Sequence, residues 1–117
     1  MRTLLAVSNK NLKVAIQADL NGKSIEVDSV STALDAYHCL NRHEYNIAII
    51  DHDLPDLDGL LMANWLKQED KDIKIILISS KNSADLAQKA ESLNVIHFNK
   101  CECKEGIFRK LVEKDLI

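Results

Sequence analysis

The sequence is poor in the features that mark several classes of protein. Aromatic residues make up only 4% of its 117 positions, too few for a surface that stacks nucleic-acid bases. No stretch approaches the roughly 18 apolar residues that a membrane span requires. No block of five or six like charges indicates a patch for nucleic acid or for a membrane surface, and the net charge is −3. We therefore expect neither nucleic acid nor a membrane as a partner of this domain.

Cysteine, proline and glycine are scarce as well. Three cysteines, an odd number, argue against a disulfide framework and for a reducing compartment. The N-terminal apolar run stops at Ser8 and is too short for the core of a signal peptide, so we expect a cytoplasmic location. With one proline and three glycines there is no Pro/Gly/Ser-rich linker. The length is that of one domain, which we place at residues 1–117.

What the sequence does contain is a strict alternation of apolar runs and helical periodicity. Strands are predicted at 4–7, 24–30, 45–51, 73–79 and 95–98, each followed by a helical pattern. Ser31 or Thr32 is expected to cap the second helix, and Asn82 or Ser83 to begin the fourth. The alternation predicts an α/β fold with a doubly wound parallel sheet between two helical layers, the flavodoxin-like (βα)5 arrangement with strand order 2-1-3-4-5. The expected inward residues of the five helices are Leu12, Ala15, Ile16, Leu20; Ala33, Tyr37, Leu40; Leu61, Met62, Trp65, Leu66; Leu86, Ala90, Leu93; and Ile107, Phe108, Leu111, Val112.

The third predicted strand ends in a carboxylate. Its apolar run stops at Asp51, and the following loop holds the chain's only proline, Pro55, and then Gly59. In an open parallel sheet, ligands bind at the carboxyl ends of the strands. Asp51 is therefore either a capping residue for this loop or a functional acid.

Other polar residues follow the neighbouring strands. Ser8 and Asn9 come after the first strand. Ser79 ends the fourth, and Lys100 lies just beyond the fifth. A carboxylate can attack phosphorus, a hydroxyl can bind a phosphoryl oxygen, and an ammonium can neutralise another oxygen. Together with Asp51, these residues form a set suited to handling a phosphoryl group.

On these residues the chain resembles, over essentially its whole length, the receiver domain of two-component response regulators, such as the bacterial chemotaxis regulator. Asp51 and the loop Leu54-Pro55-Asp56-Leu57-Asp58-Gly59 are similar to the phosphoacceptor aspartate and its loop. The resemblance implies that Ser79 and Lys100 contact the phosphoryl group, and that His97 stands where the family has a switch aromatic.

The resemblance also implies what the domain does and what it binds. It implies a signalling module, not an enzyme, with at most self-phosphorylation on Asp51 from a phosphodonor. A sensor histidine kinase or another signalling protein is the implied partner. In the family, the face made by the fourth helix, fifth strand and fifth helix docks partners or forms homodimers. Here that face would comprise residues 84–93, His97 and residues 107–112.

The first strand departs from the family pattern. Family members carry two acids at its tip that gather Mg²⁺ together with the phosphoacceptor, whereas this chain has Ser8 and Asn9. Since Mg²⁺ binds chiefly through carboxylates, we predict a degraded pocket with weak Mg²⁺ affinity or none. Asn9 and Asp53 are the candidate substitutes, and no other cofactor is expected. With fewer repelling acids, we expect Asp51 to pair directly with Lys100.

Several functions stay open on this evidence. The leading interpretation is an atypical receiver domain that works as a signalling and protein-interaction module, with or without phosphorylation. The alternative is a conventional Mg²⁺-dependent receiver that takes a phosphoryl group from a histidine kinase onto Asp51. A flavodoxin-like domain that binds a small ligand is disfavoured, because no glycine-rich or Ser/Thr-rich phosphate loop follows the first strand. A hydrolase is disfavoured too, since we expect no nucleophile elbow and no His–acid pair at this edge.

The remaining cysteines and histidines fit structural roles. Cys101-Glu102-Cys103 has poor spacing for zinc, and we interpret these residues as filling a loop after the fifth strand. His38 and His43 are expected on the surface and Cys39 partly buried. His97 either moves as the family's aromatic does, with a charge that can change near neutral pH, or is a half-buried polar residue at a strand end.

Overall fold

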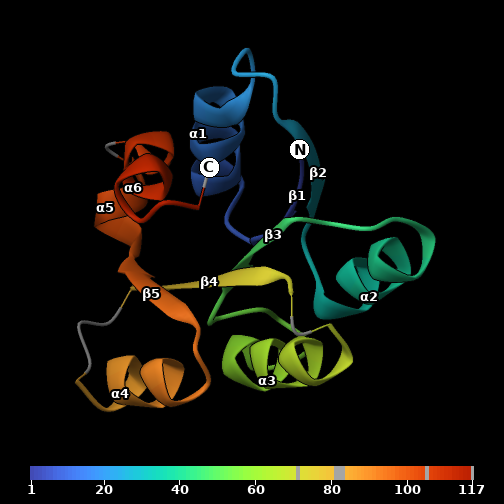
Figure 1. Cartoon of the computed structure of the whole chain (residues 1–117), viewed down its shortest axis with the longest axis vertical. Coiled ribbons are helices and arrows are strands. Elements are labelled where there is room, and N and C mark those ends of the chain that lie inside the picture. The colour runs from blue at the N-terminus through green and yellow to red at the C-terminus, as the bar shows by residue number, and fades with distance from the viewer. Residues whose placement is uncertain (71, 81–83, 105, 117) are drawn as a thin grey trace.

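Five parallel strands form one sheet in the order β2-β1-β3-β4-β5 (Figure 1), in a computed structural model that describes residues 1–70, 72–80, 84–104 and 106–116. The flavodoxin-like topology is thus confirmed, and each strand bound lies within two residues of the prediction. The strands are β1 (Arg2–Ala6), β2 (Glu26–Val30), β3 (Ile47–Asp51), β4 (Lys74–Ser79) and β5 (Ile96–Asn99). The helices are α1 (Lys10–Leu20), α2 (Ala33–Arg42), α3 (Gly59–Glu69), α4 (Ala84–Ser92), α5 (Lys100–Lys104) and α6 (Ile107–Glu113).

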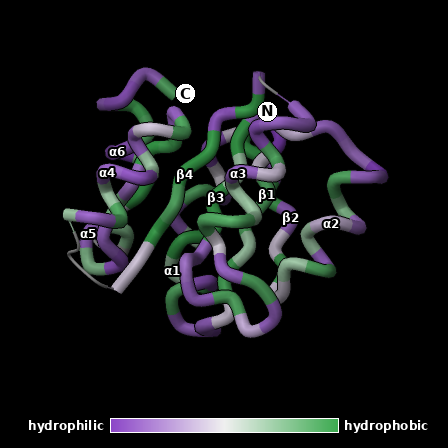
Figure 2. Tube along the Cα trace, turned by 90° about the horizontal axis from the view of Figure 1, so that it is seen from below, coloured by the Kyte–Doolittle hydropathy of each residue, from purple (hydrophilic) through white to green (hydrophobic). Residues whose placement is uncertain are grey.

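Helices cover both faces of this sheet. α1, α5 and α6 lie on one face, while α2, α3 and α4 lie on the other (Figures 1 and 2). Successive residues of β3 point to opposite faces: Ala48 packs with the α2–α4 layer and Ile49 with the α1 layer. Every residue of β3 is buried, which is typical of a parallel strand covered on both sides. Asp51, the last of them, is the one charged residue of that strand.

The segment after β5 differs from the prediction. A loop was expected there, but the chain forms the short helix α5, which makes six helices within the described part of the chain. Cys103 is buried against the α1-side core and Cys101 is exposed. Burial raises the pKa of the Cys103 thiol to about 12. A five-residue helix spans too few turns to show a helical period in the sequence.

Three side chains predicted to point inward are exposed instead. Tyr37, Leu61 and Val112 are 44%, 59% and 48% exposed. In α2 the buried positions are Ala33 and Ala36, small residues that let the helix lie close to the sheet while larger apolar residues stay at its margin. The predicted Thr32 cap is confirmed, as its hydroxyl accepts from the Asp35 amide at 3.1 Å. The predicted start of the fourth helix at Asn82 or Ser83 lies outside the described residues.

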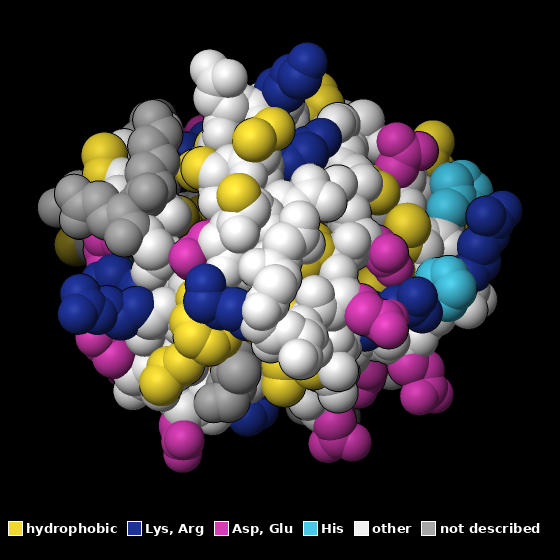
Figure 3. All heavy atoms as spheres, turned by 90° about the horizontal axis from the view of Figure 1, so that it is seen from above, with side chains coloured by type: hydrophobic (Ala, Val, Ile, Leu, Met, Phe, Trp, Pro, Cys, Tyr) yellow, Lys and Arg dark blue, Asp and Glu magenta, His cyan; other side chains and the backbone are white. Residues whose placement is uncertain are grey.

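The surface on the α1 side mixes charged and apolar side chains. Figure 3 shows this side, where lysine or arginine and aspartate or glutamate side chains are interspersed with apolar ones. Within the residues that the structure describes, no helix is both long enough and apolar enough to cross a membrane.

Gly59 begins α3 directly against the end of β3. Its amide donates to the His52 carbonyl at 3.0 Å. A Cβ at this position would lie 2.2 Å from the Asp51 carbonyl oxygen and 2.8 Å from the His52 Cα. Only a residue without a side chain allows α3 to start so close to Asp51.

We predict that Gly59→Ala lowers the free energy of unfolding by about 2 kcal/mol, because the new methyl group meets backbone atoms that cannot yield without shifting α3 or β3. Urea denaturation measures the effect. The control is Asp58→Asn, which keeps an oxygen for the Leu60 amide and should change stability by no more than about 0.5 kcal/mol. Equal unfolding midpoints for Gly59→Ala and the unaltered chain would contradict this account.

Candidate functional site

A buried ion pair lies at the carboxyl edge of the sheet. Asp51, at the end of β3, is fully buried, and its Oδ1 lies 2.9 Å from the Nζ of Lys100. Lys100 is the first residue of α5, immediately after β5, and its side chain is 19% exposed. A carboxylate removed from water is costly unless a partner compensates its charge. Lys100 supplies that charge, so the expected direct pairing of these two residues is present.

Asp53 completes a small network around this pair. Its amide donates to Asp51 Oδ1 at 2.9 Å, and its carboxylate Oδ2 lies 3.5 Å from Lys100 Nζ. The Ser80 hydroxyl lies 3.5 Å from the same Oδ2. Asp51 Oδ2, by contrast, is buried with no hydrogen-bond partner among the described residues. One oxygen of the buried acid is therefore compensated by Lys100, and the other remains as an acceptor.

Ser79 and His97 lie side by side at the ends of β4 and β5. Ser79 is fully buried, and its Oγ is hydrogen-bonded to His97 Nε2 at 2.7 Å. Burial lowers the pKa of His97 below its usual value, because a charged imidazole loses hydration there, and nearby Glu102 opposes this shift. In this structure the predicted phosphoryl-contacting hydroxyl is thus linked to the predicted switch residue.

Of the two residues expected to replace the metal-binding acids, Asp53 lies beside the Asp51–Lys100 pair and Asn9 is engaged elsewhere. The side-chain oxygen of Asn9 accepts from the Leu12 amide at 3.0 Å and caps α1. Ser8 is exposed, and the Asp53 carboxylate is directed to Lys100. Over the described residues, no group of three or more histidine, cysteine, aspartate or glutamate side chains could hold a metal ion. Mg²⁺ is usually held by one or two carboxylates with water in its other positions, and of the expected substitutes only Asp53 lies in the Asp51 network.

The loop between β3 and α3 carries His52, which lies between two acids. Its Nδ1 is 3.4 Å from Asp53 Oδ1, and its Nε2 is 3.5 Å from Asp58 Oδ1. The prediction that no His–acid pair occurs at this edge was therefore wrong. Asp58 also caps α3 by accepting from the Leu60 amide at 2.8 Å, while Pro55 lies exposed within the loop. These contacts fix the loop against α3.

Asp56, in the same loop, has a role that the sequence analysis did not identify. Its two carboxylate oxygens accept from the amides of Ala33 at 2.8 Å and Leu34 at 3.0 Å. These are the first two residues of α2, whose amides have no partner within the helix. The two hydrogen bonds lower the pKa of Asp56. Asp56 lies 23 residues from Ala33 in the sequence, so this cap has no local sequence signal. Thr32, which directly precedes α2, does have one.

Two further histidines and Cys39 lie where the sequence analysis placed them. His38 and His43 are exposed and Cys39 is half-buried. On the predicted docking face, Ile107 belongs to the core and Val112 is exposed. Glu102 is bonded to Lys110 Nζ at 2.9 Å, which lowers the pKa of Glu102 and raises that of Lys110.

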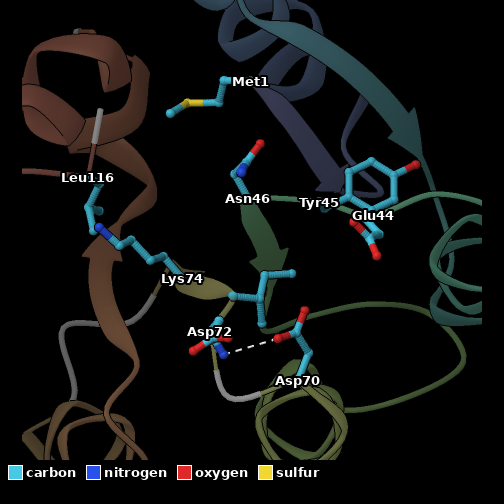
Figure 4. Close-up of a pocket in the computed structure, with 9 residues that line it drawn as sticks. Met1, Glu44, Tyr45, Asn46, Asp70, Asp72, Lys74 and Leu116 are labelled. Carbon is cyan, nitrogen blue, oxygen red and sulfur yellow. Dashed lines mark hydrogen bonds between the residues drawn. The ribbon is translucent and has the colours of Figure 1, made fainter.

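A cavity of about 580 Å³ lies at the opposite edge of the sheet (Figure 4). It opens beside the residues at the starts of β3 and β4, including Asn46 and Lys74. Asp70 and Asp72 line it and are joined by a hydrogen bond of 3.0 Å from the Asp72 amide. Asp51 stands at the other end of β3, so this cavity does not belong to the Asp51 network.

Comparison with known proteins identifies similar sequences and folds. A family model described as the response regulator receiver domain matches residues 7–110. The transcriptional regulatory protein TctD of Salmonella typhimurium is 30% identical over 95 residues, which are 81% of this chain and 42% of that protein. The transcriptional regulatory protein PhoP of Escherichia coli is 30% identical over 83 residues, 71% of this chain and 37% of that protein. This chain thus spans about two fifths of the length of these curated relatives.

A solved structure has a similar fold. The signal receiver domain of an HD domain-containing protein from Pseudomonas fluorescens superimposes with a TM-score of 0.84. The match covers 98% of this chain and 85% of that one, at 20% sequence identity. At this identity the likeness concerns the arrangement of strands and helices alone.

We predict that Lys100→Ala destabilises the chain by about 3 kcal/mol, because it leaves the buried Asp51 carboxylate uncompensated. Asp51→Asn should cost less, since it removes the charge that needs compensation and Lys100 retains Asp53. In the double variant Asp51→Asn, Lys100→Ala, the loss of unfolding free energy should be smaller than the sum of the two single losses. Lys110→Ala, which breaks the more exposed pair with Glu102, is the control and should cost at most about 1 kcal/mol. If denaturation midpoints were unchanged in Lys100→Ala, the pair would have no structural role.

We also predict that the stability given by Asp56 depends on pH. Because its folded-state pKa is lowered, its contribution is present above the ordinary aspartate pKa, near about 4, and is lost as pH falls through the folded-state value. Asp56→Ala should therefore lower the melting temperature at pH 7, and the difference from the unaltered chain should shrink in acid. Asp35→Ala, which removes another acid near the start of α2, is the comparison. A difference that is constant from pH 7 down to pH 3 would contradict the capping role.

Proposed function

Because the chain belongs to the response regulator receiver-domain family, we propose that it acts as an atypical receiver domain of a two-component or phosphorelay protein. In this proposal residues 1–117 form one receiver domain that signals by contact with partner proteins. Its Mg²⁺ pocket is degraded, and Asp51 is held by Lys100 instead. The observation that carries the proposal is the 2.9 Å contact between Lys100 Nζ and the buried Asp51, next to a first strand without acids.

In the unmodified site, the positive charge of Lys100 compensates the negative charge of Asp51. An acid at the end of a buried strand needs a positive charge nearby, and here a lysine of the same chain provides it. Ser79 and His97 continue the connection from β4 to the edge strand β5. A partner bound beside β5 would favour one position of His97, and the Ser79 hydroxyl would follow. Signals would then pass between this surface and the Asp51 site without any covalent change.

A conventional phosphoacceptor is the second candidate. It is favoured by one observation, the buried Asp51 Oδ2 with no hydrogen-bond partner among the described residues. In that reaction Oδ2 would form the new bond to phosphorus as the phosphorus–nitrogen bond of a phosphohistidine breaks. Lys100 and Ser79 would then contact phosphoryl oxygens. Because Asp51 is fully buried, the loop that begins at His52 would have to move first.

Intact mass after incubation with a small-molecule phosphodonor, with and without Mg²⁺, separates the two candidates. We predict no gain of a phosphoryl group on this chain under conditions that modify an ordinary receiver domain. The informative companion is the double variant Ser8→Asp with Asn9→Asp, which restores two acids and should gain a phosphoryl group only with Mg²⁺.

Two controls make the result decisive. Adding Asp51→Asn to the double variant should abolish its gain, because the acceptor oxygen is removed. A Mg²⁺-dependent gain on the unaltered chain that disappears in Asp51→Asn would instead establish the conventional phosphoacceptor and reject our proposal.

A further inference from the structure

Large apolar side chains are concentrated on α2, on the loop before α3 and on α3. Of the seven exposed large apolar side chains among the described residues, four lie here. Leu34 is 60% exposed, Tyr37 44%, Leu57 42% and Leu61 59%. The other three are Met1, Val14 and Val112, which belong to other parts of the chain. An exposed apolar cluster of this kind is typical of a binding surface.

These side chains form one continuous surface. Tyr37 and Trp65 join the two helices, with ring centroids 5.4 Å apart. Leu61 and Trp65 are four residues apart in α3, so they are neighbours on the helix. Leu34 and Tyr37 are likewise three apart in α2. We call Leu34, Tyr37, Leu57, Leu61 and Trp65 the α2–α3 surface.

The backbone around this surface is fixed, and a cavity opens beside it. The two hydrogen bonds from the start of α2 to Asp56 hold the loop that carries Leu57 next to Leu34. A cavity of about 350 Å³ lies between the two helices next to the Tyr37–Trp65 ring pair. Leu40, Leu66 and Ile73 form its apolar lining. α3 lies between α2 and α4 on this side of the molecule, so the surface spans the outer helix α2 and the middle helix α3 (Figures 1 and 2).

Acidic residues stand at both ends of the α2–α3 surface. Glu44, Glu69 and Asp70 line the cavity at one end. At the other end are Asp35, in the first turn of α2, and the two loop acids, Asp56 and Asp58.

Among the described residues no ion pair joins a lysine or arginine to these acids, although Lys74 lines a second cavity together with Glu44 and Asp70. Lys67 donates to the Ile73 carbonyl at 3.1 Å. Arg42 lines a different cavity, between α2 and β2. Lys89, on α4, is paired with Asp85 at 3.2 Å. The α2–α3 surface is therefore an apolar strip with acidic residues at both ends.

We propose that the α2–α3 surface docks a helical segment of a partner protein that is apolar along one side and carries lysine or arginine at both ends. An amphipathic helix lying in an apolar groove is an established way of recognising a peptide, and the basic ends would match the acids. A second copy of this chain would bring acids against acids. Phosphate groups of nucleic acid or of an acidic membrane would be repelled in the same way.

This inference goes beyond the proposed function. The α2–α3 surface contains neither Asp51 nor Lys100, and it is separate from the predicted face of α4, β5 and α6. The proposal that this surface docks a helix therefore does not depend on whether Asp51 is phosphorylated.

The test uses a synthetic amphipathic peptide of about 16 residues, roughly 24 Å long as a helix. The peptide has leucine along one side, two lysines at each end and no tryptophan. Trp65 is the chain's only tryptophan, so its fluorescence reports directly on the surface. We expect a saturable blue shift as the peptide covers the indole. Leu34→Gln and Leu61→Gln should each weaken binding about fivefold or more, as for central interface residues.

Matched controls distinguish specific docking from non-specific binding of an apolar peptide. Val14→Gln, which alters a residue of 55% exposure on α1, should leave the affinity unchanged. A peptide with glutamate in place of the lysines should bind about tenfold more weakly at low salt, with a smaller difference at high salt. A scrambled peptide of equal composition should show no saturable shift.

Several outcomes would overturn the proposal. They are an absent or non-saturable shift, equal binding of the scrambled or glutamate peptide, and unchanged binding by Leu61→Gln. Sedimentation of the chain without peptide tests whether a second copy of the chain occupies this surface. A concentration-dependent dimer that Leu61→Gln abolishes would assign the surface to a second copy and reject the partner helix.

Discussion

The buried carboxylate of Asp51 imposes the constraint on which the carboxyl edge of the sheet depends. β3 lies in the middle of a sheet covered on both sides, and Asp51 at its end is fully buried. Lys100 must therefore come within contact distance, and its place at the start of α5 fixes where the chain turns after β5. Gly59 must lack a side chain for α3 to begin beside the same acid. The charge of Asp51 thus constrains the start of α5, and its backbone constrains the start of α3.

Side-chain oxygens at the helix starts extend this arrangement across the layer of α2 and α3. Asp58 caps α3, and Asp56, two residues earlier in the loop, caps α2. Both acids belong to the loop that begins directly after Asp51. The position of α2 relative to β3 is therefore set by polar contacts of this loop as well as by apolar packing. Asn9 has a comparable role at α1, which is why its oxygen is engaged in a cap rather than directed to Asp51.

The features that the sequence predicted correctly are those with a local or periodic signal. Strands, strand order and the approach of Lys100 to Asp51 follow from apolar runs, strict alternation and residues at strand ends. α5 was missed because five residues show no period. The Asp56 cap was missed because its partners are 22 and 23 residues away. Tyr37 and Leu61 were misplaced because hydropathy alone does not distinguish an apolar side chain that faces the sheet from one that is exposed.

The Asp51 site and the proposed docking surface share the loop after β3. Asp53 at its start contacts Lys100, Asp56 holds the first turn of α2, and Leu57 is itself part of the surface. A helix docked on Leu57 and Leu34 would restrain the loop whose movement would expose Asp51. Any change at Asp51 that moved the loop would disturb the docking surface in turn. Coupling of this kind is reciprocal, so each event would change the free energy of the other by the same amount. A receiver with few acids around its buried aspartate would thus still have a physical route by which a partner protein and the Asp51–Lys100 pair influence each other.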